Sequence, residues 1–99
     1  MKSVIQDKKE CYLCRFLYNS ERTFTLEEHH IFFGTANRRL SEKYGMKVLL
    51  CHAHHTGSDR AVHMNKNYDT TLKRIAQRKF EEIHTRQEFM SVFGKNYLL

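Results

Sequence analysis

The hydrophobic pattern in the first half of the chain predicts short strands. One segment combines β-branched and aromatic residues in partial alternation and ends near His29 and His30. A second apolar run leads directly to Cys51, and Gly45 before it suits the C-terminal end of a helix. The elements expected here are a strand within 23–32, a loop over 34–37, a short helix over 38–44, a strand over 47–50 and a helical turn over 51–55.

The last third of the chain predicts two amphipathic helices over residues 69–94. Asp69 or Thr70 can cap the first helix, Thr85 can cap the second, and Gly94 can end it. Their apolar positions are Leu72, Ile75, Ala76, Phe80 and Ile83, then Phe89, Met90, Val92 and Phe93. We expect these helices to cover the strand-rich half, and the polar residues 1–10 to be a loosely held lead-in.

Composition is consistent with one small globular unit over residues 1–99. Hydrophobic residues make up 40% of the 99 residues, charged residues 28%, and proline is absent. Because no apolar run reaches about 20 residues and the start of the chain has no secretory pattern, we expect a cytoplasmic protein without a membrane partner.

The charge balance favours an anionic partner. Seventeen Lys and Arg residues against eleven Asp and Glu residues give a formal net charge of +6. Arg38, Arg39 and Lys43 follow the histidine pair closely, so they are candidates for phosphate contacts. A second basic group is equally compatible with a solvated helix face or with contact; it comprises Lys73, Arg74, Arg78 and Lys79.

The cysteines predict a structural zinc site. Cys11-x2-Cys14 is followed by Cys51-x2-His54, which together offer three thiolates and one imidazole. This is a closed tetrahedral set that zinc prefers, and a small chain often depends on such a metal for stability. The alternative is three small buried cysteines, but the two-residue spacing at both ends argues against it.

The histidine pair predicts a second, chemically different site. Neighbouring residues of a strand point to opposite faces, so one of His29 and His30 could hold a metal ion while the other takes a proton from water. His55, directly after the predicted zinc ligand His54, could supply another ligand. The alternative is that the pair are ordinary strand histidines. His52 and His84 are expected to be structural or solvated.

The order of these motifs resembles the HNH endonucleases, most of all small, often phage-encoded members braced by a zinc knuckle. The resemblance covers Cys11 to His63 and implies an α+β protein with a ββα-metal core over residues 11–63. It implies that His29 and His55 hold a catalytic divalent cation and that His30 is the general base. It also implies that Asn37 orients the base, although Asn37 lies earlier than the asparagine usual in the family.

A third ligand for the catalytic ion is also implied by the resemblance. His63 is the favoured candidate, and Asp59 is its rival because it lies four residues after His55. Gly57 argues against a continuous helix there and so favours His63. The ion could be Mg²⁺, Mn²⁺, Ni²⁺, Co²⁺ or Zn²⁺.

The sequence therefore predicts an enzyme that cleaves double-stranded DNA, acting alone, as a homodimer or within a larger phage assembly. Two alternatives stay open. One is a zinc-knuckle DNA-binding module without catalysis, and the other is a structural or adaptor protein of a larger assembly. The adjacent His29 and His30 separate the enzyme from both, because a structural zinc site does not need them.

Overall fold

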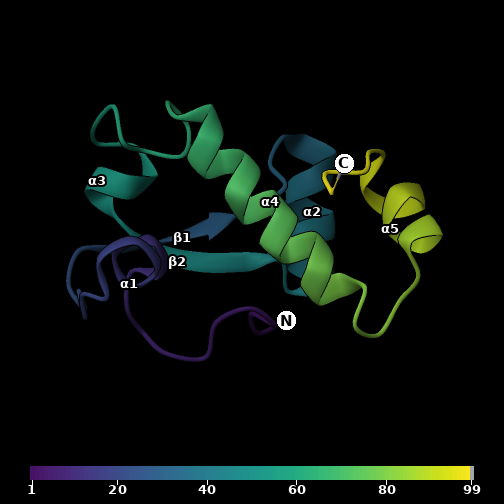
Figure 1. The fold of residues 1–99 in the computed structure, drawn as a ribbon, viewed down its shortest axis with the longest axis horizontal. Coiled ribbons are helices and arrows are strands. Elements are labelled where there is room, and N and C mark those ends of the chain that lie inside the picture. The colour runs from purple at the N-terminus through teal and green to yellow at the C-terminus, as the bar shows by residue number, and fades with distance from the viewer. Residues whose placement is uncertain (99) are drawn as a thin grey trace.

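The computed structural model describes residues 1–98 and shows a small α+β fold. A two-stranded antiparallel sheet lies at its centre, and helices surround it (Figure 1). In chain order the elements are α1 (Tyr12–Tyr18), β1 (Leu26–His30), α2 (Thr35–Tyr44), β2 (Lys47–Cys51), α3 (His52–His55), α4 (Lys66–Phe80) and α5 (Arg86–Phe93).

The two strands form a hairpin, and the segment that connects them, residues 31–46, contains helix α2. The register pairs Leu26 with Cys51 at one end and His30 with Lys47 at the other. The strand β1 is shorter than the segment from which it was predicted, because Thr25 adopts a positive φ of 53° that interrupts the extended backbone. The strand over 47–50 and the turn over 51–55 are confirmed, whereas the loop predicted over 34–37 is wrong because α2 begins at Thr35.

Gly45 ends α2 and also makes room for the N-terminal segment. Its φ of 70° is left-handed, and a Cβ there would lie only 2.5 Å from the carbonyl oxygen of Lys2. The Val4 N–H donates to the Gly45 carbonyl at 3.0 Å, and the Leu49 N–H donates to Gln6 Oε1 at 2.8 Å. The expectation of a loosely held lead-in is therefore wrong, because these residues satisfy backbone groups along the edge of β2.

The C-terminal helices form largely as predicted. Helix α4 begins at Lys66, one turn earlier than expected, because the Asn65 side chain accepts the N–H groups of Asn67 and Tyr68. Helix α5 has the expected Thr85 cap, which forms a capping box with Glu88. Ile83 follows the end of α4 and is 81% exposed, so its predicted place on the apolar face is wrong.

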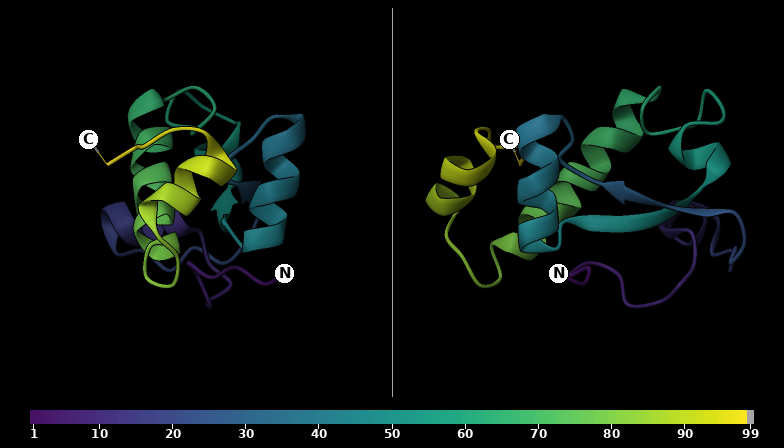
Figure 2. Two further views of the ribbon diagram at one scale, coloured as in Figure 1. Left: turned by 90° about the vertical axis from the view of Figure 1, so that its right-hand side faces the viewer. Right: turned by 180° about the vertical axis from the view of Figure 1, so that it is seen from behind.

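An aromatic core joins these helices to the end of the hairpin. The ring of Phe32, two residues after β1, stacks on Phe93 with centroids 4.1 Å apart and contacts Phe89 at 5.6 Å. Phe80 of α4 packs on Phe89 at 5.4 Å. Seen from behind, α4 crosses the hairpin and α5 lies beyond α2 (Figure 2). The helices thus hold β1 in place just where its two histidines lie.

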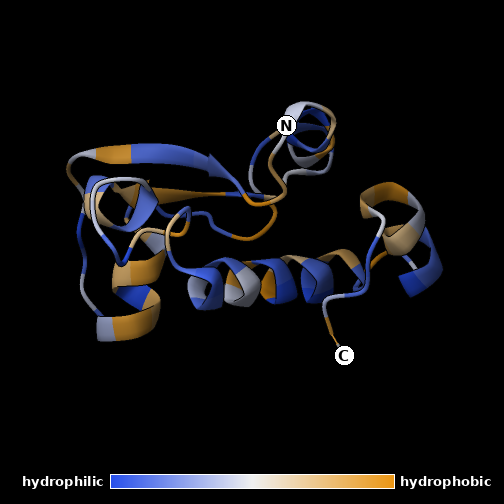
Figure 3. Ribbon diagram, turned by 90° about the horizontal axis from the view of Figure 1, so that it is seen from above, coloured by the Kyte–Doolittle hydropathy of each residue, from blue (hydrophilic) through white to orange (hydrophobic). Residues whose placement is uncertain are grey.

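Hydropathy divides the hairpin into an apolar strand and a polar one. Strand β2 is mostly hydrophobic, whereas all of β1 after Leu26 is hydrophilic (Figure 3). Among residues 1–98, no helix is long and apolar enough to cross a bilayer. The glutamates and histidines of β1 are thus the hairpin side chains best suited to acid–base or metal chemistry.

Candidate metal centres

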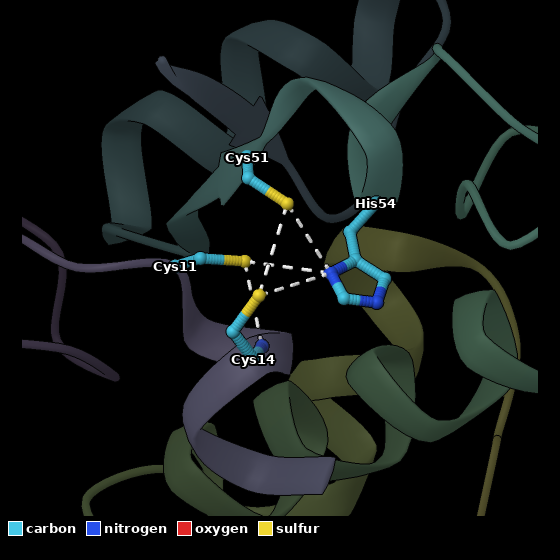
Figure 4. Close-up of side chains that lie close together, drawn as sticks. All are labelled: Cys11, Cys14, Cys51 and His54. Atoms are coloured by element: carbon cyan, nitrogen blue, oxygen red, sulfur yellow. Dashed lines mark hydrogen bonds between the residues drawn. The ribbon is translucent and has the colours of Figure 1, made fainter. Parts of the chain in front are cut away.

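The first cluster consists of Cys11, Cys14, Cys51 and His54, all of them buried. Figure 4 shows their sulfur atoms and the His54 ring converging on one point. Nδ1 of His54 lies 3.3 Å from the sulfur of Cys51, 3.4 Å from that of Cys14 and 3.7 Å from that of Cys11, and the sulfurs of Cys14 and Cys51 are 3.8 Å apart. A tetrahedral zinc ion with ordinary bond lengths separates sulfur from nitrogen by about 3.6 Å and sulfur from sulfur by about 3.8 Å. The cluster therefore has the size that a zinc ion requires.

Three separate elements deliver these ligands. Cys11 and Cys14 lie at the start of α1, where the Cys14 N–H donates to the Cys11 sulfur. Cys51 ends β2, and His54 follows it within α3. A metal ion here would join α1 to the hairpin, so its effect on this small core would be structural.

The surroundings of the sulfur cluster disfavour free thiolates. Burial above all, and then the neighbouring Cys11 and Cys51 sulfurs, raise the pKa of the Cys14 thiol to about 12. Three thiolates at this spacing repel one another and have lost their hydration. They become stable together only when a metal ion compensates their charge.

The second cluster brings together His29, His55 and His63. Each offers one ring nitrogen, and the three nitrogens lie within 4.8 Å of one another. The ring centroids are 5.2 Å apart for His29 and His55, 5.1 Å for His29 and His63, and 5.0 Å for His55 and His63. Asp59, the rival third ligand, is not in this group.

Backbone hydrogen bonds explain how residues so far apart in sequence meet. His29 lies near the end of β1, and His55 is the last residue of α3. The loop after α3 folds back, because the Val62 N–H donates to the His54 carbonyl at 2.8 Å. Val62 is itself buried, and this anchor brings the next residue, His63, beside His55.

His29 is the buried member of this cluster and is suited to bind a cation. It is 1% exposed, and its Nε2 atom has no hydrogen-bond partner among the described residues. Burial above all, and then the neighbouring His55, His63 and His30, lower its pKa to about 3. The ring is therefore neutral at physiological pH with an unsatisfied nitrogen, which is the state that a metal ligand requires.

A carboxylate that the sequence did not reveal contacts two histidines of α3, one of which belongs to this cluster. Glu27 Oε1 accepts the Nδ1–H of His55 at 2.7 Å, and Glu27 Oε2 accepts the Nδ1–H of His52 at 3.0 Å. These bonds, from His55 first, lower the pKa of Glu27 below its usual range. A signal for it was present, since Glu27 and His29 are two residues apart on a strand and share a face.

His30 lies on the opposite face of β1, turned toward α2. Its Nε2 lies 3.4 Å from Oε2 of Glu42 and 3.7 Å from Oε1 of Glu28. Lys47 donates to the same Glu42 oxygen at 2.7 Å, which balances part of the negative charge. The two histidines diverge as predicted for neighbours on a strand, and Glu42 is a second carboxylate that the sequence did not reveal.

The remaining predicted residues lie on α2. Arg38, Arg39 and Lys43 of α2 line an open hollow of about 570 Å³ together with Glu28, His30 and Glu42. Asn37 lies in the first turn of α2, and among the described residues no hydrogen bond joins it to His30. Glu42 occupies the position beside the ring that Asn37 was expected to take.

Comparison with known proteins gives no relative from which a role could be transferred. No protein-family model matches the chain, and neither a curated protein nor a solved structure matches it. The two metal centres and the surface beside them are therefore the features that bear on function.

Proposed function

We propose that the protein is a metal-dependent endonuclease of the HNH kind, with β1, β2 and α3 as its ββα-metal centre. The observation that carries the proposal is the convergence of His29, His55 and His63 on one face of the hairpin end, with His30 on the other face. A structural zinc site needs none of these four histidines.

The donor set suits a divalent cation. The unpartnered Nε2 of His29 is a buried polar atom that lacks any other explanation among residues 1–98. Three imidazoles favour Zn²⁺, Ni²⁺ or Co²⁺, whereas Mn²⁺ and Mg²⁺ would need several waters as further ligands. When bound, such an ion offsets the phosphate charge and stabilises the departing oxygen.

His30 is the residue suited to activate water. Because the Glu42 carboxylate only accepts hydrogen bonds, a neutral His30 ring donates its proton from Nε2 and leaves Nδ1 as its basic nitrogen. An imidazole held in this way can take a proton from water near neutral pH. Glu42 thus supplies the orientation that the family resemblance assigned to Asn37.

The basic side chains of α2 are suited to hold the DNA backbone. Arg38, Arg39 and Lys43 lie on the wall of the hollow that contains His30. Contacts from such side chains to phosphates position a duplex without reading its sequence. Lys47 is less available for this role, because Glu42 and Glu28 already neutralise it.

The decisive experiment incubates supercoiled plasmid with the purified protein, with EDTA and with each of the five divalent ions. We expect nicking or linearisation that EDTA abolishes and that His30→Ala lowers by about 100-fold or more. His84→Ala is the matched control, since His84 lies outside both metal clusters. The proposal fails if no ion supports cleavage or if His30→Ala cuts as well as the wild type. DNA binding without cleavage would favour the zinc-knuckle binding module instead.

A further inference from the structure

The polar side chains of β1 lie on both faces of the hairpin. One of these side chains, that of Glu27, has no part in the proposed chemistry. Glu27 neither faces the hollow around His30 nor belongs to the three-histidine cluster. Its two carboxylate oxygens instead accept one hydrogen bond each from His55 and His52, both of α3. A half-exposed carboxylate that accepts from two rings at once restricts the orientation of both rings.

The hydrogen bond from His55 determines which of its nitrogens can bind a metal ion. An ionised carboxylate has no proton to give, so Nδ1 of His55 carries the proton and donates it at 2.7 Å. In a neutral ring Nε2 then holds the free lone pair. Nδ1 is directed to Glu27, so Nε2 is the nitrogen left to offer to an ion shared with His29 and His63.

We propose that Glu27 is a positioning residue that fixes the tautomer and orientation of His55 and thereby raises the affinity of the three-histidine cluster for its ion. The inference rests on the proposed role of that cluster as the catalytic metal site. Outer carboxylates of this kind orient metal-bound histidines and raise their basicity, and their loss typically weakens metal binding by about 10- to 100-fold.

His52 and Glu28 provide controls within the same few residues. His52 shares the Glu27 carboxylate but is 62% exposed and is not in the metal cluster. Glu28 is the next residue of β1, carries the same charge, and faces Lys47 and His30 on the opposite side. Loss of the Glu27 effect should therefore not be reproduced by changing either residue.

The first test measures cobalt binding to protein that already holds one zinc ion in the cysteine-rich site. Co²⁺ is added to the wild type, Glu27→Gln, Glu28→Gln and His52→Ala, and its visible absorption gives a dissociation constant for each. We expect Glu27→Gln to weaken binding by about 10-fold or more, and each control by less than about threefold. Equal affinity in Glu27→Gln and the wild type would overturn the proposal.

The second test observes the His55 ring directly, in protein with zinc only in the cysteine-rich site. Ring nitrogen NMR should find the His55 proton on Nδ1 in the wild type, and a shift toward the other tautomer in Glu27→Ala. A proton on Nε2 in the wild type would contradict the argument even if metal affinity changed. Unchanged melting of Glu27→Gln excludes misfolding as the cause.

These readouts separate this inference from the proposed function. Cobalt binding that depends on Glu27, in a protein that cleaves no DNA, would support the positioning role and refute the nuclease. Cleavage by Glu27→Gln at wild-type cobalt affinity would do the opposite. No cobalt uptake beyond the zinc site would refute the positioning role and the catalytic ion together.

Discussion

His54 and His55 are adjacent in sequence, yet their rings belong to two separate clusters of metal ligands. His54 faces the three cysteines, and His55 faces His29 and His63. Both lie in α3, which has only four residues and therefore little stability of its own. Because both residues lie in this short helix, a change that displaces His54 also displaces His55. The two clusters are therefore structurally coupled.

Replacing a zinc ligand should therefore damage both centres. We expect Cys14→Ser to lose stoichiometric zinc and cooperative thermal unfolding, because structural zinc binding is coupled to folding. Metal analysis and a melting curve check this. His52→Ala, which alters the same short helix without removing a ligand, should keep its zinc. A Cys14→Ser protein with wild-type zinc content and melting would refute the structural site.

Acid should destabilise the protein through His29. Its pKa is about 3 in the folded protein against 6.5 for an unperturbed histidine, so below pH 6.5 the unfolded chain binds a proton that the folded protein does not bind. Stability is then lost as pH falls from about 6.5 toward 3, by up to about 1.4 kcal/mol per pH unit.

Denaturant unfolding of zinc-loaded wild type and His29→Gln at pH 7 and pH 5.5 tests this. The wild type should lose about 1 kcal/mol more than the variant over that interval, since proton competition at the cysteine site is common to both. Equal losses would show that His29 titrates normally in the folded protein.

If the protein binds DNA as proposed, the basic wall of the hollow, formed by Arg38, Arg39 and Lys43, should determine the salt dependence of that binding. Removing Arg38 and Arg39 together should weaken binding and reduce the slope of log affinity against log salt by about 1 to 2, since each phosphate contact contributes about 0.9. Arg78→Ala, an exposed change on α4, is the control. An equal effect from Arg78 would place the DNA along α4 instead.

The aromatic core offers a matched pair on one helix. Phe89 is fully buried against Phe32 and Phe80, whereas Met90, the next residue, is 44% exposed. Phe89→Ala should lower the free energy of unfolding by about 3–5 kcal/mol, and Met90→Ala by less than about 1 kcal/mol. Denaturant titrations of the two variants measure the difference, and similar losses would contradict the packing described.

Sequence alone predicted which cysteines and histidines lie together, because these residue types carry their chemistry in their identity and spacing. Cys11, Cys14, Cys51 and His54 meet as expected, and the structure brings His29, His55 and His63 together. Glu27 and Glu42 could not be singled out in the same way, because glutamates are common on protein surfaces. Glu27 follows from strand alternation, but the approach of Glu42 to His30 depends on how α2 packs on the hairpin.

Elements set by tertiary contacts were the hardest to predict. The N-terminal residues have no pattern of their own, and only the open edge of β2 explains why they are ordered. Helix α4 begins early because a side-chain cap at Asn65 outweighs the equally reasonable caps at Asp69 and Thr70.

The alternation along β1 makes strand pairing a determinant of chemistry as well as of stability. Successive residues face opposite sides, so Glu27 and His29 meet α3 while Glu28 and His30 meet α2. A slip of one residue between the strands would send each histidine into the other's surroundings, with every side chain still present. An insertion or deletion within residues 26–30 should therefore disrupt both arrangements, even where every functional side chain is retained.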